Sequence, residues 1–180
     1  MNDALIKHLL DHSVKRGSFT LRSGKQSDWF IDAKQTTCSP DGMLLVADAV
    51  LGLLPDDITA IGGLTMGADA VAFSVAAIAA TRGRMLRSFS VRKEEKDHGA
   101  GGRVAGVLAP GDRVALTDDA ITRGVAFLEA AGAVRAAGAT PVVAIPVVDR
   151  GGTAEAMCMD DGIAFTPLVT APDLGFDYEG

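Results

Sequence analysis

The sequence is poor in several residue types on which common classes of protein depend. With one Trp, one Tyr and seven Phe in 180 residues, the core must be built mainly from Ala, Val, Leu and Ile. The two cysteines, Cys38 and Cys158, have neither a C-x-x-C motif nor metal-ligand spacing, which excludes a disulfide scaffold and fits a reducing compartment. The formal net charge of −6 argues against a general nucleic-acid binder but leaves room for a local anion site.

Long apolar runs are also missing. The first ten residues contain Asp3, Lys7 and His8 and lack the apolar stretch of a secretory signal. The Ala-rich stretch from Val71 to Ala80 is far shorter than the roughly 20 residues that a membrane-spanning helix needs. We therefore expect a cytoplasmic protein with no membrane or nucleic-acid partner.

The length and the order of the expected elements indicate one α/β domain spanning residues 1–180. Strands and helices alternate through the middle of the chain, which favours a central parallel sheet flanked by helices. The expected helices are residues 5–14 (stopped by Gly17), 40–54 (capped by Ser39), 68–80, 125–137 and 154–159. The expected strands are residues 18–21, 29–32, 58–61, 85–91, 113–116, 142–148 and 164–169.

The segment from Val114 to Gly124 carries the strongest chemical signal. A hydrophobic strand ends in Asp118 and Asp119, and a short loop containing Thr122 leads into a helix. Ligands of open α/β sheets bind at the carboxyl ends of the strands, and backbone N–H groups at a helix start attract a phosphate. The carboxylates would repel that phosphate, but they accept hydrogen bonds from ribose hydroxyls. The segment therefore predicts a site for a pentose 5-phosphate.

Two other interpretations fit the same residues. Asp118 and Asp119 can act as helix caps, with Gly124 easing a tight turn. They can also be the acidic pair of a phospho-acceptor receiver domain. That pair normally follows the first strand of its domain, whereas this one comes late in the chain, so the receiver interpretation is the weaker one.

A second polar segment, residues 92–103, follows the strand expected at 85–91. Arg92, Lys93, Lys96 and His98 place three cations and an imidazole within seven residues, and three glycines follow as possible hinges. Such a loop can close over a polyanion and exclude water from it. The alternative is a solvated charged loop, because three carboxylates nearly neutralise the cations.

Both segments resemble one family of enzymes. Asp118 to Ala126 is similar to the loop that binds phosphoribosyl diphosphate (PRPP) in the type I phosphoribosyltransferases. The pattern R-K-x-x-K-x-H-G from Arg92 to Gly99 resembles the mobile catalytic loop of the orotate phosphoribosyltransferases in order, spacing and position. The resemblance covers about residues 17–150. It implies the type I phosphoribosyltransferase fold, with a small N-terminal segment that covers the substrate.

The resemblance also assigns roles to single residues. It implies catalytic roles for Lys96, His98, Asp118 and Asp119. The residues implied to bind PRPP are Thr65, Met66, Arg92, Lys93, Lys96, His98, Asp118, Asp119, Ala120, Ile121, Thr122, Arg123, Gly124, Val125 and Ala126. Those implied to bind orotate are Arg22, Phe30, Ile31, Thr122 and Arg150. Without the resemblance, Phe30 would be a strand-core aromatic, Gly62 to Asp69 a plain strand-to-helix turn and Arg150 a surface residue.

Four positions depart from the family pattern. Arg22 and Met66 stand where lysine is common, so the second change removes a cation that would face the diphosphate. Arg123 replaces a small residue and Val125 a hydroxyl residue in the phosphate loop. These changes bear on the affinity for PRPP more than on the identity of the family.

The resemblance implies transfer of the 5-phosphoribosyl group from PRPP to N1 of orotate, giving orotidine 5'-monophosphate and diphosphate in pyrimidine biosynthesis. Mg²⁺ would be held mainly through PRPP, with no protein ligand cluster. A homodimer with shared active sites is also implied. In the family, the residues matching Arg92, Lys96 and His98 serve the neighbouring subunit's site, and the one matching Lys93 serves its own.

Two other functions share the PRPP motif. One is a phosphoribosyltransferase for another base, against which the R-K-x-x-K-x-H-G loop and Arg150 speak. The other is a non-catalytic regulator that binds PRPP. Such regulators usually add a basic nucleic-acid surface, which a net charge of −6 does not support.

Overall fold

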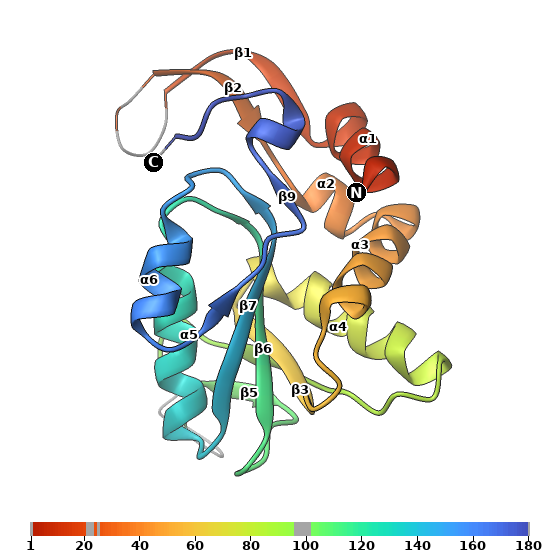
Figure 1. Ribbon diagram of the computed structural model, residues 1–180, viewed down its shortest axis with the longest axis vertical. Coiled ribbons are helices and arrows are strands. Elements are labelled where there is room, and N and C mark those ends of the chain that lie inside the picture. The colour runs from red at the N-terminus through yellow and green to blue at the C-terminus, as the bar shows by residue number, and fades with distance from the viewer. Residues whose placement is uncertain (1, 21–23, 25, 96–101, 180) are drawn as a thin grey trace.

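A mostly parallel sheet forms the middle layer of the protein (Figure 1). The structure is a computed structural model that describes residues 2–20, 24, 26–95 and 102–179. The strand order is β5-β4-β3-β6-β7-β8, with β9 also beside β7, and only the pairing of β5 with β4 is antiparallel among the described strands of this sheet. The strands are β3 (Ala60–Leu64), β4 (Arg87–Val91), β5 (Val104–Gly106), β6 (Arg113–Ile121), β7 (Thr140–Asp149), β8 (Ala164–Phe165) and β9 (Val169–Thr170). The expected α/β architecture is confirmed.

Helices cover both faces of this sheet (Figure 1). Helices α3 (Pro40–Leu53) and α4 (Gly67–Thr81) lie on one face, and α5 (Val125–Ala136) and α6 (Ala154–Asp160) lie on the other. The start of α3 is the one expected, because Ser39 Oγ accepts a hydrogen bond from the Gly42 N–H at 3.1 Å. Small residues let α4 approach the sheet closely, and its buried residues are Ala68, Val71, Ala72, Val75 and Ala79.

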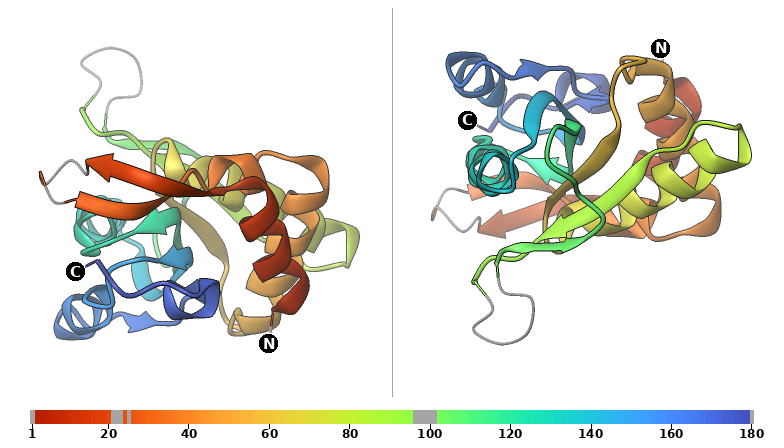
Figure 2. Two further views of the ribbon diagram at one scale, coloured as in Figure 1. Left: turned by 90° about the horizontal axis from the view of Figure 1, so that it is seen from above. Right: turned by 90° about the horizontal axis from the view of Figure 1, so that it is seen from below.

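The N-terminal segment lies across the carboxyl ends of the central strands (Figures 1 and 2). It consists of α1 (Asp3–His12), the antiparallel hairpin β1 (Val14–Thr20) and β2 (Gln26–Ile31), and the short helix α2 (Lys34–Thr37). Residues after the 3-10 helix η1 (Pro172–Leu174) pack beneath the hairpin, where the Trp29 and Phe176 rings stack with centroids 4.3 Å apart. The hairpin is thereby fixed over the edge of the sheet.

Three sequence-based boundaries are wrong. Helix α1 ends at His12, because Val14 pairs with Ile31 in the hairpin, and Gly17 lies inside β1 rather than after a helix. Strand β6 continues to Ile121 instead of ending near residue 116, because it pairs with β7 along its whole length. The strand expected at 164–169 is divided into β8 and β9, because Pro146 of β7, which accepts the Leu168 N–H opposite the gap, has no N–H of its own to donate back.

The other expected elements are present with ends shifted by a few residues, while α2, β5 and η1 were not predicted. No helix in the described ranges has the length and apolar character needed to span a bilayer.

Candidate active site

The carboxyl ends of the parallel strands bring the predicted site residues to one edge of the sheet. Leu64 at the end of β3 pairs with Val91 at the end of β4, and Asp118 in β6 pairs with Pro146 in β7. The segments that leave these strands carry Thr65, Arg92, Thr122 and Arg150. Residues that are far apart in the sequence therefore meet where α/β sheets bind ligands.

Two neighbouring carboxylates occupy the last part of β6. Asp119 is only 6% exposed. Its Oδ2 atom contacts Lys34 Nζ from helix α2, and its Oδ1 atom accepts the Ala120 N–H at 2.8 Å. The Asp119 N–H in turn donates to Asp118 Oδ1 at 2.9 Å. These contacts fix the orientation of both carboxylates.

The start of helix α4 lies directly against this pair. A Cβ atom at Gly67 would lie 2.0 Å from Asp118 Oδ1 and 2.7 Å from Asp119 Oδ1, so any larger residue there would displace these carboxylates. The N-terminal end of a helix carries a partial positive charge, which favours nearby carboxylates. Gly67 therefore lets the loop expected to receive the diphosphate approach the acidic pair closely.

The surroundings of Asp118 favour its protonated form. Burial, together with the negative charge of Asp119, raises the pKa of Asp118 from 3.8 to about 8, and the charge of Lys34 only partly opposes this. A carboxyl group in these surroundings binds its proton more tightly than a free aspartic acid does.

A row of backbone donors follows the acidic pair. Gly124 has a positive φ of 79° and turns the chain into helix α5. None of the N–H groups from Thr122 to Ala126 donates a hydrogen bond to another described residue. Free N–H groups at the start of a 12-residue helix are the donors that a phosphate requires. The geometry supports the phosphate site predicted from the sequence.

Arg150 follows β7 at the other end of the edge. Its Nη2 atom contacts Glu179, which also accepts the Ser27 hydroxyl at 2.5 Å. Its guanidinium carbon lies 5.2 Å from the centre of the Trp29 ring, and its Nε atom is buried with no hydrogen-bond partner in the described part of the chain. Arg150 thus lies between the hairpin and β7, not on an open surface.

Comparisons with known proteins place this geometry in a family. No protein-family model matches the chain. An orotate phosphoribosyltransferase of Streptomyces avermitilis is 40% identical over 176 residues, covering 97% of each chain. One of Rhodopirellula baltica is 34% identical, covering 96% of this chain and 93% of that protein. The chain belongs to the orotate phosphoribosyltransferase family.

Solved structures of this family have the same fold. A Mycobacterium tuberculosis orotate phosphoribosyltransferase in complex with PRPP has a TM-score of 0.82 at 30% identity, covering 97% of this chain and 99% of that one. The same enzyme in complex with Fe(III) dicitrate has a TM-score of 0.87 at 32% identity, with similar coverage. The type I phosphoribosyltransferase fold expected from the motifs is confirmed.

The other residues predicted to bind PRPP differ in their exposure and in their contacts. Met66 is 69% exposed, whereas Thr65 donates to Asp69 Oδ2 at 2.7 Å. Ala120 and Ile121 belong to strand β6, and the Ile121 side chain is buried in the core. The Arg123 and Val125 side chains are exposed.

On the base side, Phe30 is 36% exposed, while the Ile31 side chain is buried in the core, so only its backbone is available to a ligand. The Arg92 N–H donates to Arg103 O at 2.7 Å, and the Lys93 side chain is exposed. Arg22, Lys96 and His98 lie outside the described residues.

Two charged contacts of the site were missed by the sequence analysis. Lys34 lies in a helix that was not predicted, and Glu179 lies in the tail beyond the family motifs. Neither belongs to a motif. The sequence shows that each residue carries a charge opposite to that of its partner, but it does not show that the two lie close together in the fold.

We predict that Asp118→Asn removes a pH dependence of stability. The pKa of Asp118 is about 8 in the folded chain against 3.8 in the reference state. Between these values the unfolded chain loses a proton that the folded chain keeps. The free energy of unfolding of the wild type therefore falls as the pH rises. In urea unfolding, Asp118→Asn should gain stability over the wild type between pH 5 and pH 9.

Asp56→Asn, at an exposed position, is the matched control and should follow the wild-type curve. Parallel curves for Asp118→Asn and the wild type would show that Asp118 is ionised in the folded protein throughout this range.

Proposed function

We propose that this protein transfers the 5-phosphoribosyl group of PRPP to N1 of orotate, giving orotidine 5'-monophosphate and diphosphate. The observation that carries this proposal is the row of free N–H groups from Thr122 to Ala126, directly after the acidic pair. A pentose phosphate satisfies both features, because its phosphate accepts hydrogen bonds from the N–H groups and its ribose hydroxyls donate hydrogen bonds to the carboxylates.

The ribose phosphate is bound by β6 and the loop after it. The N–H groups of residues 122–126 bind the 5-phosphate, so the exposed side chains of Arg123 and Val125 need not contribute. Asp118 and Asp119 accept hydrogen bonds from the ribose hydroxyls. They also favour the positive charge that grows on the ribose as the bond from C1 to the diphosphate oxygen breaks and its electron pair leaves with diphosphate.

Mg²⁺ fits this site as a substrate-bound ion. Asp119 Oδ2 is engaged by Lys34 and Oδ1 by the Ala120 N–H, so the carboxylate has limited capacity for a metal. Within the described ranges, no group of three or more His, Cys, Asp or Glu side chains is placed to hold a metal. We therefore assign the ion to PRPP, where it supplies neutralisation of the leaving diphosphate.

The base is bound between the hairpin and β7. Arg150, which Glu179 also contacts, is a cation for the orotate carboxylate, and the Phe30 backbone and Thr122 lie on the two segments beside it. The loop after β6 is close, because the Arg150 N–H donates to Ile121 O at 2.8 Å and a Cβ at Gly151 would lie 1.8 Å from Thr122 O. Arg22, outside the described residues, is assigned to the same end.

The leaving group is bound by the opposite end of the site. Thr65 and Met66 precede helix α4, whose start faces the acidic pair. Arg92, Lys93, Lys96 and His98 add positive charge and a proton-bearing imidazole from the loop between β4 and β5. Charge on diphosphate peaks in the transition state, so these groups act mainly on turnover.

We also propose that the protein is a cytoplasmic homodimer in which Arg92, Lys96 and His98 serve the partner's site. Helices α3 and α4 carry large apolar side chains that a partner would cover: Leu44 is 52% exposed, Leu53 44% and Phe73 47%. Cys38 and Cys158 form no disulfide, which fits a reducing compartment.

The function is tested by following orotate absorbance with PRPP and Mg²⁺, in the wild type and in Lys96→Ala. The wild type should consume orotate, and the variant should lose about 100- to 1000-fold in kcat, as for one removed oxyanion donor. Its free energy of unfolding should change by less than about 0.5 kcal/mol, as for a surface substitution. Lys7→Ala, on the exposed side of α1, is the control.

Consumption of uracil or adenine in place of orotate would identify a transferase for another base. PRPP binding without consumption of any base would identify a regulator.

The shared site is tested by mixing two inactive variants. Co-refolded Lys96→Ala and Asp119→Asn chains should form heterodimers with one intact site, because Lys96 acts in the partner's site and Asp119 in its own. Random pairing then restores about a quarter of wild-type activity, the share expected for a symmetric dimer. No recovery, with heterodimers demonstrated by native mass spectrometry, would refute the shared site.

A further inference from the structure

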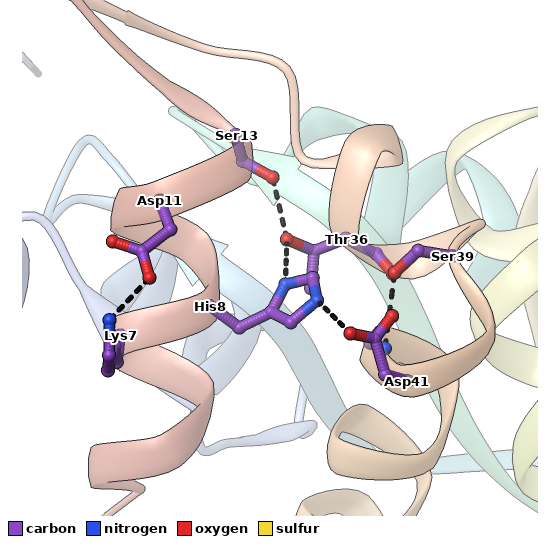
Figure 3. Close-up of polar contacts among 8 residues, drawn as sticks. Lys7, His8, Asp11, Ser13, Thr36, Ser39 and Asp41 are labelled. Atoms are coloured by element: carbon purple, nitrogen blue, oxygen red, sulfur yellow. Dashed lines mark hydrogen bonds and ion pairs between the residues drawn. The ribbon is translucent and has the colours of Figure 1, made fainter.

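Helix α2 is held through Thr36 by a polar cluster that also links α1 to α3 (Figure 3). The Thr36 hydroxyl lies 3.0 Å from His8 Nδ1 and 2.7 Å from Ser13 Oγ, which belong to α1 and the turn after it. His8 Nε2 lies 3.2 Å from Asp41 Oδ2 in α3. Thr36 is fully buried. The helix is therefore a rigid support for the residues that it carries.

Lys34, the first residue of α2, extends from this support into the active site. Its ammonium group contacts Asp119 Oδ2, and its side chain is 42% exposed while that of Asp119 is 9% exposed. Partial burial disfavours the charge on Lys34, but Asp119 outweighs this, helped by Asp32 and Asp118, and the pKa of Lys34 is raised. The ammonium group thus stays charged while it faces three carboxylates.

The contact lies between the ribose end and the diphosphate end of the site. The same Asp119 carboxylate that binds Lys34 through Oδ2 faces the Gly67 backbone through Oδ1. Gly67 directly follows Met66, an exposed, uncharged side chain at the start of α4. Lys34 accordingly brings a positive charge to the part of the site where Met66 supplies none.

We propose that Lys34 is a positioning residue of the PRPP site, which holds the Asp119 carboxylate for the ribose hydroxyls and offsets the negative charge of the acidic pair toward the anionic substrate. The inference rests on the proposed function, because it takes Asp119 as the acceptor of the ribose hydroxyls. With Oδ2 on Lys34 and Oδ1 on the Ala120 N–H, Asp119 cannot rotate away, and each oxygen keeps a lone pair for a hydroxyl.

The test separates PRPP binding from orotate binding. Isothermal titration of the full chain with PRPP and Mg²⁺ should give a Kd about tenfold higher for Lys34→Gln, the lower end expected for one charged hydrogen bond. The KM for orotate should stay within about twofold of wild type, because the charged contact of Lys34 in the described part of the chain is with Asp119, whereas that of Arg150 is with Glu179. Lys34→Arg should restore PRPP affinity, and Lys7→Gln is the matched control, since Lys7 lies 2.5 Å from Asp11 on α1.

Unchanged or tighter PRPP binding by Lys34→Gln would overturn the proposal, as would an equal rise in KM for both substrates. Loss of affinity in Lys34→Arg would also overturn it, because the charge is retained there. If Lys34→Gln failed to fold, the ion pair would be a structural element and the proposal would be wrong. Failure of the wild type to consume orotate would instead contradict the proposed function, and the PRPP titrations would still measure the effect of Lys34.

Discussion

Two adjacent carboxylates held in a partly buried site at the end of β6 impose the main constraint on this structure. Carboxylates removed from water are costly unless they are paired, hydrogen-bonded or neutralised. Three features meet that need together: the pKa of Asp118 is raised to about 8, Lys34 pairs with Asp119, and Gly67 admits the start of α4. Each comes from a different part of the chain, so the acidic pair links the N-terminal segment to the sheet.

The rest of the site extends from this pair in two directions. Toward α5, the N–H groups from Thr122 to Ala126 donate to no other residue in the described part of the chain, which is the arrangement that a phosphate needs. Toward β7, Arg150 contacts Trp29 and Glu179, and Glu179 also accepts the Ser27 hydroxyl, so the hairpin and the tail both lie against this residue. In the proposed function, the same edge of the sheet would bind the phosphate, the ribose and the base through different groups.

The parts of the fold and the site that could be predicted are those that depend on residues close together in the sequence. The Ser39 cap, the helix after Gly124 and the acidic pair followed from residues close together in sequence, and the family was identified from two such motifs. The course of β6 to Ile121 was not predictable, because it depends on pairing with β7. Lys34 and Glu179 were missed because their partners lie 85 and 29 residues away along the chain. The resemblance assigned the backbone of Phe30 and Ile31 to the base, and the buried side chain of Ile31 leaves its backbone for that role.

In the proposed function, main-chain donors after the acidic pair bind the phosphate of PRPP. Amide hydrogen exchange followed by NMR, with and without PRPP and Mg²⁺, measures these donors one by one. We expect the N–H groups from Thr122 to Ala126 to gain protection on binding, and to do so equally in Arg123→Ala, because truncating a side chain leaves the main-chain donors in place. Binding without protection of these groups, or protection lost in Arg123→Ala, would contradict it.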